Sequence, residues 1–67
     1  MTITEFRNKY PTSAVLTLFS GFFEDHGFIV TAQLTMGETI YTCGQGSGST
    51  VEEAEDKAIQ RALNHLG

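Results

Sequence analysis

The sequence predicts a two-layer α+β domain in which two helices cover one face of a three-stranded antiparallel sheet. Two observations predict this class. Apolar residues recur at helical spacing at both ends of the chain, and three runs of strand-forming residues separated by short breaks lie between them. A length of 67 residues allows one domain, residues 1–67, with the element order α-β-β-β-α.

Composition narrows the class of protein. Cys43 is the single cysteine and has no partner for an internal disulfide, which favours a cytoplasmic protein. The first ten residues lack the apolar core of a signal peptide, and no apolar run approaches the roughly 20 residues of a membrane span. We therefore expect no membrane partner. The net charge of -4 argues against a general polyanion binder.

The first predicted element is a helix over residues 3–10. Thr2 and Glu5 have the spacing of a capping box, and Pro11 ends the helical pattern. About two turns of helix are marginally stable alone, so the apolar side chains of this helix must dock on the rest of the domain. These side chains are Ile3, Phe6 and Tyr10.

Three strands are predicted over residues 14–23, 28–36 and 39–44. The glycine-rich stretch 44–50 then predicts a turn that leads into the last helix. The loop Gly37-Glu38 has the composition of a type II′ hairpin turn, which sets the register of the second and third strands. That register places these residues on the face toward the helices: Phe28, Val30, Ala32, Leu34, Met36, Tyr41 and Cys43.

The face of the first strand depends on whether Gly21 marks a bulge. The open face of the sheet receives Leu16, Leu18 and Phe22 in one case, and Val15 and Phe19 in the other. Such residues would form an apolar contact surface, although scattered surface hydrophobic residues are also usual. The predicted protein-contact residues are Leu16, Leu18, Phe22, Ile29 and Ile40.

The last predicted helix covers residues 51–66. Thr50 and Glu53 again fit a capping box, and four acidic residues lie in the first two turns, where the helix dipole favours negative charge. The predicted buried stripe is rich in small residues, which allow the helix to lie close to the sheet. Its members are Val51, Ala54, Ala58, Ile59, Ala62, Leu63 and Leu66.

The glycines and alanines at the end of the chain follow a known spacing: Gly46, Gly48, Thr50, Ala54, Ala58, Ile59, Ala62 and Leu63. This spacing resembles the pattern G-x-G-x-S-K-K-x-A-K-x-x-A-A-x-x-A-L of the double-stranded RNA-binding domain. The resemblance implies the fold predicted above and a role in RNA binding. The basic cluster of that family falls here on Val51, Glu52 and Glu55, so a phosphate would meet negative charge.

We therefore expect a non-catalytic interaction module of this fold that binds an unknown protein or a second copy of itself. The alternative is retained RNA or DNA binding through Arg7, Lys9, His26, Lys57 and Arg61. No enzyme activity, cofactor or metal is expected. The sequence offers no second cluster of metal-ligating residues that could complete a site with His26. It also does not place His26 or His65 where either could act as a base for Cys43.

Overall fold

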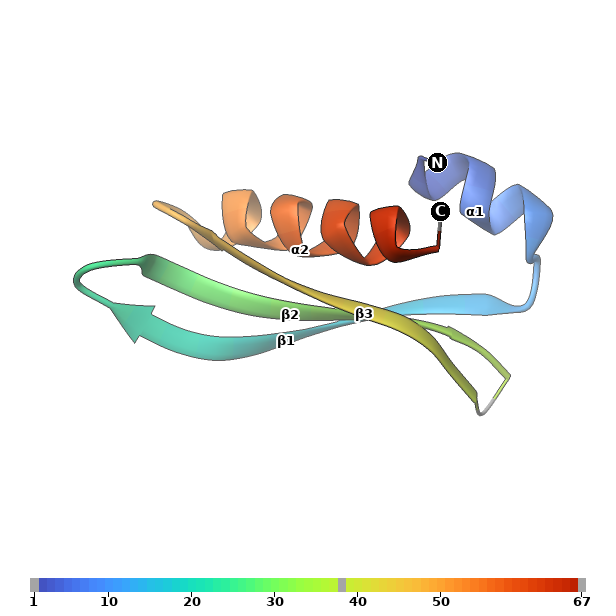
Figure 1. Cartoon of the computed structure of the whole chain (residues 1–67), viewed down its shortest axis with the longest axis horizontal. Helices are drawn as coiled ribbons and strands as arrows, with labels where there is room; N and C mark the ends of the chain where they lie inside the picture. The colour runs from blue at the N-terminus through green and yellow to red at the C-terminus, as the bar shows by residue number, and fades with distance from the viewer. Residues whose placement is uncertain (1, 38, 67) are drawn as a thin grey trace.

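Two helices lie on one face of a three-stranded antiparallel sheet in the computed structural model, which describes residues 2–37 and 39–66 apart from the side chain of Ile40 (Figure 1). In chain order the elements are α1 (Ile3–Lys9), β1 (Ser13–Phe23), β2 (Gly27–Met36), β3 (Thr39–Gly48) and α2 (Val51–His65). The strands lie in the order β1-β2-β3. The predicted class and element order are confirmed. Within the described residues, no helix is long and apolar enough to cross a membrane.

Helix α1 is held by its cap and by one buried ring. The Thr2 hydroxyl accepts a hydrogen bond from the Glu5 N–H at 3.1 Å, as the predicted cap requires. The helix ends at Lys9, one residue before the predicted end, and the Tyr10 N–H donates to the Phe6 carbonyl at 2.9 Å. The Phe6 side chain is fully buried in a cluster with Leu34, Ala62 and Leu63, flanked by Ile3, Tyr10, Val15, Ile59 and Leu66.

The β2–β3 hairpin begins as predicted. Met36 faces Thr39, and Gly37 has a φ of 64°, which the first central position of a type II′ turn requires and which glycine adopts without strain. Glu38, the second residue of the predicted turn, lies outside the described residues. The turn therefore brings the two strands together at the predicted positions.

Beyond the turn, an extra residue in β3 overturns the predicted register. Leu34 faces Thr42 rather than Tyr41, because the register shifts between Leu34 and the residue after it. The shift moves every following side chain of β3 to the opposite face. Cys43, which was predicted to be buried, pairs with Gln33 and is exposed. Tyr41 was also predicted to be in the core, and it is exposed.

Tyr41 instead joins an aromatic chain that links α1 to β3. The ring centroids of Phe6 and Tyr10 are 5.3 Å apart, and those of Tyr10 and Tyr41 are also 5.3 Å apart. A hydrogen bond with the Tyr10 side chain is the main cause that raises the pKa of Tyr41 above its usual 10.0. The bulged residue thus helps to hold α1 against the sheet.

The glycine-rich stretch that was predicted to be a turn is part of β3. Gly44, Gly46 and Gly48 occupy alternate positions of the strand on the face toward α2. A Cβ atom on Gly44 would lie 2.5 Å from the Ala62 nitrogen, and one on Gly46 would lie 2.6 Å from the Ala54 carbonyl oxygen. Glycine is needed here because the helix backbone lies directly against the strand backbone.

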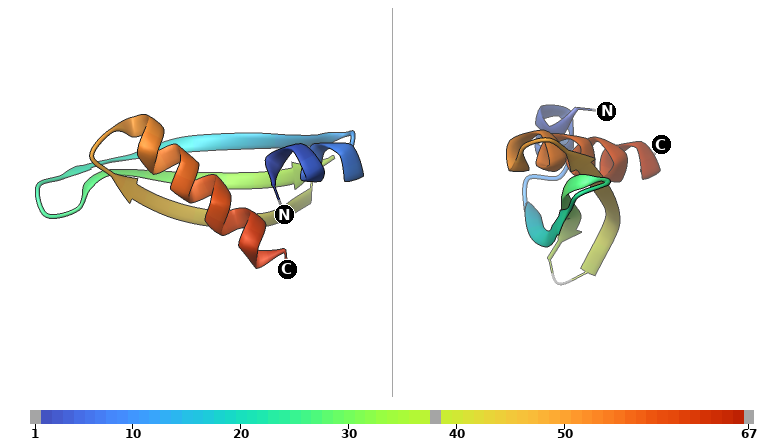
Figure 2. Two further views of the ribbon diagram at one scale, coloured as in Figure 1. Left: turned by 90° about the horizontal axis from the view of Figure 1, so that it is seen from above. Right: turned by 90° about the vertical axis from the view of Figure 1, so that its left-hand side faces the viewer.

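The side of α2 that packs against these glycines is lined by alanines. Ala54, Ala58 and Ala62 recur every four residues, so they form one stripe, and all three are fully buried. Together with Val30 and Ala32, the first two of these alanines form a second buried cluster beside the one around α1. The helix consequently lies across β2 and β3 (Figure 2).

A bulge in β1 settles which of its side chains lie on which face. The β1–β2 register shifts at Ser20. Before this bulge, Leu16 and Leu18 lie on the open face of the sheet. After the bulge, Phe22 pairs with Phe28 on the side of the helices, and their ring centroids are 4.9 Å apart. The prediction that Phe22 shares the open face with the leucines is therefore wrong.

Candidate interaction surface

Strand β1 carries most of the large hydrophobic side chains that are exposed among the described residues. Seven large hydrophobic side chains are exposed among the described residues, and five of them belong to β1. Their exposed fractions are 49% for Leu16, 45% for Leu18, 56% for Phe19, 59% for Phe22 and 51% for Phe23. We call these five side chains the β1 apolar surface. Leu16, Leu18 and Phe23 lie on the open face of this strand, and Phe19 and Phe22 lie on its helix side. Because all five follow one edge strand rather than being scattered singly over the molecule, they mark a contact site along that strand.

Phe19 and Phe22, on the helix side of β1, are exposed because α2 packs on the other two strands. The helix approaches β3 closely through the glycines and reaches β2 through Val30 and Ala32, which leaves β1 at the side of the helix layer (Figure 2). On the helix side, Phe19 and Phe22 contact the Phe28 ring beside the helix, and both remain more than half exposed. The glycines of β3 and the phenylalanines of β1 therefore account for the part of the surface on the helix side.

The strand is also free of charge. None of the eleven residues from Ser13 to Phe23 is acidic or basic. Edge strands of soluble proteins usually carry lysine, proline or another device that prevents pairing with a further strand. The only such device in β1 is the bulge at Ser20, which leaves the seven residues before it regular.

The structure places only some of the predicted open-face residues on the open face. Leu16 and Leu18 lie on the open face, where Ile29, which pairs with Ser47, lies as well. Of Ile40 only the backbone in β3 is described, and its side chain lies outside the described set. The sequence argument did not include Phe23 in the predicted surface. The absence of charge from residues 13–23 is the signal that could have found it.

Negative charge gathers at the end of the molecule where α2 begins. The β1–β2 loop carries Glu24 and Asp25, and Gly27 at the end of this loop lies against Gly48, three residues before the helix. The first two turns of α2 contribute four more acids: Glu52, Glu53, Glu55 and Asp56. The positions that match the basic cluster of RNA-binding domains are therefore surrounded by carboxylates.

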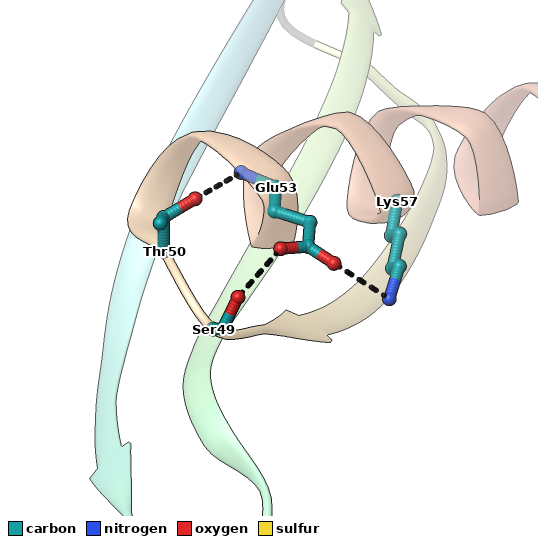
Figure 3. A network of polar contacts seen from close by, with 4 residues as sticks. All are labelled: Ser49, Thr50, Glu53 and Lys57. Carbon is teal, nitrogen blue, oxygen red and sulfur yellow. Dashed lines mark hydrogen bonds and ion pairs between the residues drawn. The ribbon is translucent and has the colours of Figure 1, made fainter.

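The start of α2 is fixed by a small polar network (Figure 3). The Thr50 hydroxyl accepts a hydrogen bond from the Glu53 N–H at 3.1 Å, so the predicted cap is present. The Glu53 carboxylate accepts a hydrogen bond from the Ser49 hydroxyl at 2.8 Å and pairs with Lys57 at 3.5 Å. The Ser49 hydrogen bond, followed by the charge of Lys57, lowers the pKa of Glu53 below its usual 4.5.

This network predicts a pH dependence of stability. Because the pKa of Glu53 is lower in the folded than in the unfolded chain, its carboxylate stabilises the fold above about pH 4.5, and this contribution is lost as the pH falls through the folded pKa. In urea unfolding, we expect the free energy of unfolding of Glu53→Gln to be lower than that of the wild type at about pH 7. At about pH 3 the two free energies should be nearly equal.

Glu52→Gln is the matched control for this prediction. It removes one charge from the same helical turn and leaves the contacts of Glu53 with Ser49 and Lys57 in place. An equal, pH-independent loss of stability in both variants would contradict the assigned role of Glu53.

The five residues of the predicted nucleic-acid surface are not gathered on one surface. Arg7 and Lys9 are on α1, at the opposite end of the molecule from the loop that holds His26 (Figure 1). Lys57 pairs with Glu53, and the Arg61 guanidinium donates to the Gln45 carbonyl at 2.9 Å. The bases of the described residues therefore form no continuous basic patch.

Two of these five residues, His26 and Arg61, line the same depression. A half-open depression of ≈ 220 Å³ lies between the β1–β2 loop and the edge of β3. His26 from the β1–β2 loop and Arg61 from α2 both line it. Its lining is completed by Ile29, Gln45, Gly46 and Ser47.

Comparison with known proteins agrees with the fold. The model of a family described as Slr1353 N-terminal dsRNA-binding domain-like matches residues 3–66, a range that includes both helices and all three strands. No curated protein and no solved structure matches the chain. The family match confirms the resemblance to double-stranded RNA-binding domains that the glycine and alanine spacing predicts.

Proposed function

We propose that this chain, which belongs to the Slr1353 N-terminal dsRNA-binding domain-like family, is a non-catalytic module that binds protein rather than double-stranded RNA. The observation that carries the proposal is the β1 apolar surface, in which five large side chains of an uncharged strand are each about half exposed. Its single cysteine favours a reducing compartment such as the cytoplasm.

The apolar surface supports a protein partner on energetic grounds. Each Å² of apolar surface removed from water contributes about 25 cal/mol, so covering several half-exposed leucine and phenylalanine side chains supplies a favourable free energy of association. Nucleic acids gain most of their affinity from phosphate contacts, which an uncharged strand does not offer. A protein with its own apolar patch is the partner that matches this surface.

The acidic end of the molecule opposes RNA binding. Two opposite charges about 4 Å apart attract by about 1 kcal/mol in water, and like charges repel by the same amount. Glu52 and Glu55 occupy two of the three positions of the family's basic cluster, and Glu24 and Asp25 lie in the neighbouring loop. A phosphate placed at the start of α2 would therefore be repelled.

The second candidate function is nucleic-acid binding away from the start of α2, through the basic side chains and His26. The observation that favours it is the depression bordered by His26 and Arg61, with Arg7, Lys9 and Lys57 as more distant contacts. Binding of this kind would depend steeply on salt, because each phosphate contact releases counterions.

A lysine pair at the start of α2 tests the charge argument. Val51→Lys/Glu52→Lys restores the two adjacent lysines of the family pattern at two exposed positions. The prediction that Val51 belongs to the buried stripe is wrong, because its side chain is 37% exposed. In a low-salt titration with a labelled RNA duplex, we expect no submicromolar binding by the wild type. The variant should bind at least about tenfold more tightly and with a steeper salt dependence.

The matched control is Glu5→Lys/Gln60→Lys, which makes the same change in net charge at exposed positions away from the start of α2. The control should gain much less affinity than the lysine pair. Submicromolar, salt-sensitive binding of duplex RNA or DNA by the wild type would show that the proposed function is wrong.

A further inference from the structure

We infer that the protein partner is a second copy of this chain, with the two β1 strands paired antiparallel at their free edges so that the two sheets become one. This inference rests on the proposed function and adds to it the identity of the partner and the geometry of the interface. Four observations support it: the difference between the two sheet edges, the direction of the free backbone groups of β1, the distribution of charge and the side-chain pattern.

The outer edge of β3 is already occupied by α2. The Arg61 guanidinium donates to the Gln45 carbonyl at 2.9 Å, and His65 Nδ1 donates to the Cys43 carbonyl at 2.8 Å. These two side chains lie four residues apart on the helix and hold two carbonyls that lie two residues apart on the strand. The side chains of Arg61 and His65 thus occupy the carbonyls through which a further strand would pair, so β1 is the edge that is left open to a partner.

The same geometry shows which groups of β1 face outward. In an antiparallel strand, the N–H and C=O of one residue point to the same side, and successive residues alternate. The Thr35 hydroxyl of β2 donates to the Ala14 carbonyl at 3.4 Å, so Ala14 points toward β2. Leu16 and Leu18 follow it on that side. Between Ala14 and the bulge, three residues therefore point their backbone groups to the free edge: Val15, Thr17 and Phe19.

The charge distribution favours a second copy in the antiparallel orientation. Residues 13–23 carry no charge, so the contact itself brings no like charges together despite the net charge of -4. The acidic loop and the start of α2 lie at one end of β1. Antiparallel pairing directs the acidic ends of the two copies to opposite ends of the dimer, whereas parallel pairing would place them side by side.

A two-fold axis at Thr17 gives a self-complementary register. The outward-facing residues then form the hydrogen-bonded pairs, with Val15 opposite Phe19 of the second copy and Thr17 opposite its own equivalent. Leu16 lies opposite Leu18 of the second copy, twice, in the closer non-hydrogen-bonded pairs. Apolar pairs therefore form on both faces of the joined sheet. Such a small interface predicts a dissociation constant of the order of micromolar.

Sedimentation velocity on the whole chain tests the inference. We expect the wild type to pass from monomer to dimer as its concentration rises through the micromolar range. Thr17→Pro removes an outward N–H that the β1–β2 ladder does not use, and it should weaken the dimer at least about tenfold with the circular dichroism spectrum unchanged.

Leu18→Lys is a second variant that keeps the test valid if the proline disturbs the strand. It places a charge opposite Leu16 of the second copy, at a position already 45% exposed in the monomer. It should also dissociate the dimer, while Gln60→Lys on the exposed face of α2 should not.

Three outcomes would overturn the inference. Association that persists equally in Thr17→Pro and Leu18→Lys would place the contact elsewhere. A wild-type chain that stays monomeric at about 1 mM and binds no duplex RNA would exclude the second copy and leave the proposed function with a different protein partner. A monomer that binds duplex RNA with submicromolar affinity would overturn both.

Discussion

Gly46→Ala is expected to lower the free energy of unfolding by about 3 kcal/mol, which is a large part of the roughly 3 to 10 kcal/mol available to a domain of this size. The added Cβ would lie 2.6 Å from the Ala54 carbonyl oxygen and even closer to the Ala58 nitrogen. Both contacts are backbone atoms of α2, so no side-chain rotation relieves them, and the helix must move away from the sheet. Urea unfolding of the purified variant measures the loss.

Two variants make this prediction specific. Gln45→Ala changes the neighbouring residue of β3, whose side chain lies on the opposite face, and it should alter stability by no more than about 0.5 kcal/mol. Adding Ala58→Gly to Gly46→Ala should not restore stability, because the clash is with the helix backbone rather than with the Ala58 methyl group. A full rescue by Ala58→Gly would contradict the packing described for β3 and α2.

Phe6→Ala is expected to cost about 3 to 5 kcal/mol, as truncation of a fully buried phenylalanine does in other cores. Phe6 is the buried side chain of α1, and a helix of seven residues does not persist without tertiary packing. The variant should therefore lose α1 from the sheet and expose Leu34 and Leu63. A drop in the urea midpoint together with a loss of helical circular dichroism would be the result.

Arg7→Ala is the control for that variant, because Arg7 is the next residue of the same helix and is exposed. Its effect should stay within about 0.5 kcal/mol. If Phe6→Ala unfolded at the wild-type midpoint, the docking of α1 through this ring would be wrong.

Most of the fold could be predicted because its signals are local. The two helix caps, at Thr2 and Thr50, depend on residues three positions apart, and both hydroxyls accept the predicted N–H. The hairpin at Gly37 likewise depends on a short loop. Local chemistry of this kind can be read from neighbouring residues without knowing what packs against them.

The errors arose where one extra residue or one distant element decides the outcome. The bulge at Tyr41 shifts the pairing by one residue and moves Cys43 to the open face of the sheet. The bulge at Ser20 shifts the pairing in the same way and moves Phe22 from the open face to the side of the helices. The stretch around Gly46 has the composition of a turn, yet it forms a strand because α2 lies against it. No local pattern distinguishes a glycine that bends the chain from one that admits a helix.

The candidate interaction surface was predictable in part for the same reason. The sequence left two faces open for Leu16 and Leu18, and only the pairing of β1 with β2 places them on the open face. The exposure of Phe19 and Phe22 depends on where α2 lies, which is set by the glycines of β3 rather than by β1 itself. The missing charge of β1 was visible in the sequence throughout.

Amide hydrogen exchange in β1, measured by NMR at several protein concentrations, tests the central claim most directly. In the paired dimer the N–H groups of Val15, Thr17 and Phe19 are hydrogen bonded to the second copy, so their protection should rise with concentration. Those of Leu16 and Leu18 face β2 and should be protected at every concentration, which provides an internal control. Fast, concentration-independent exchange at Val15, Thr17 and Phe19 up to about 1 mM would contradict pairing through this edge.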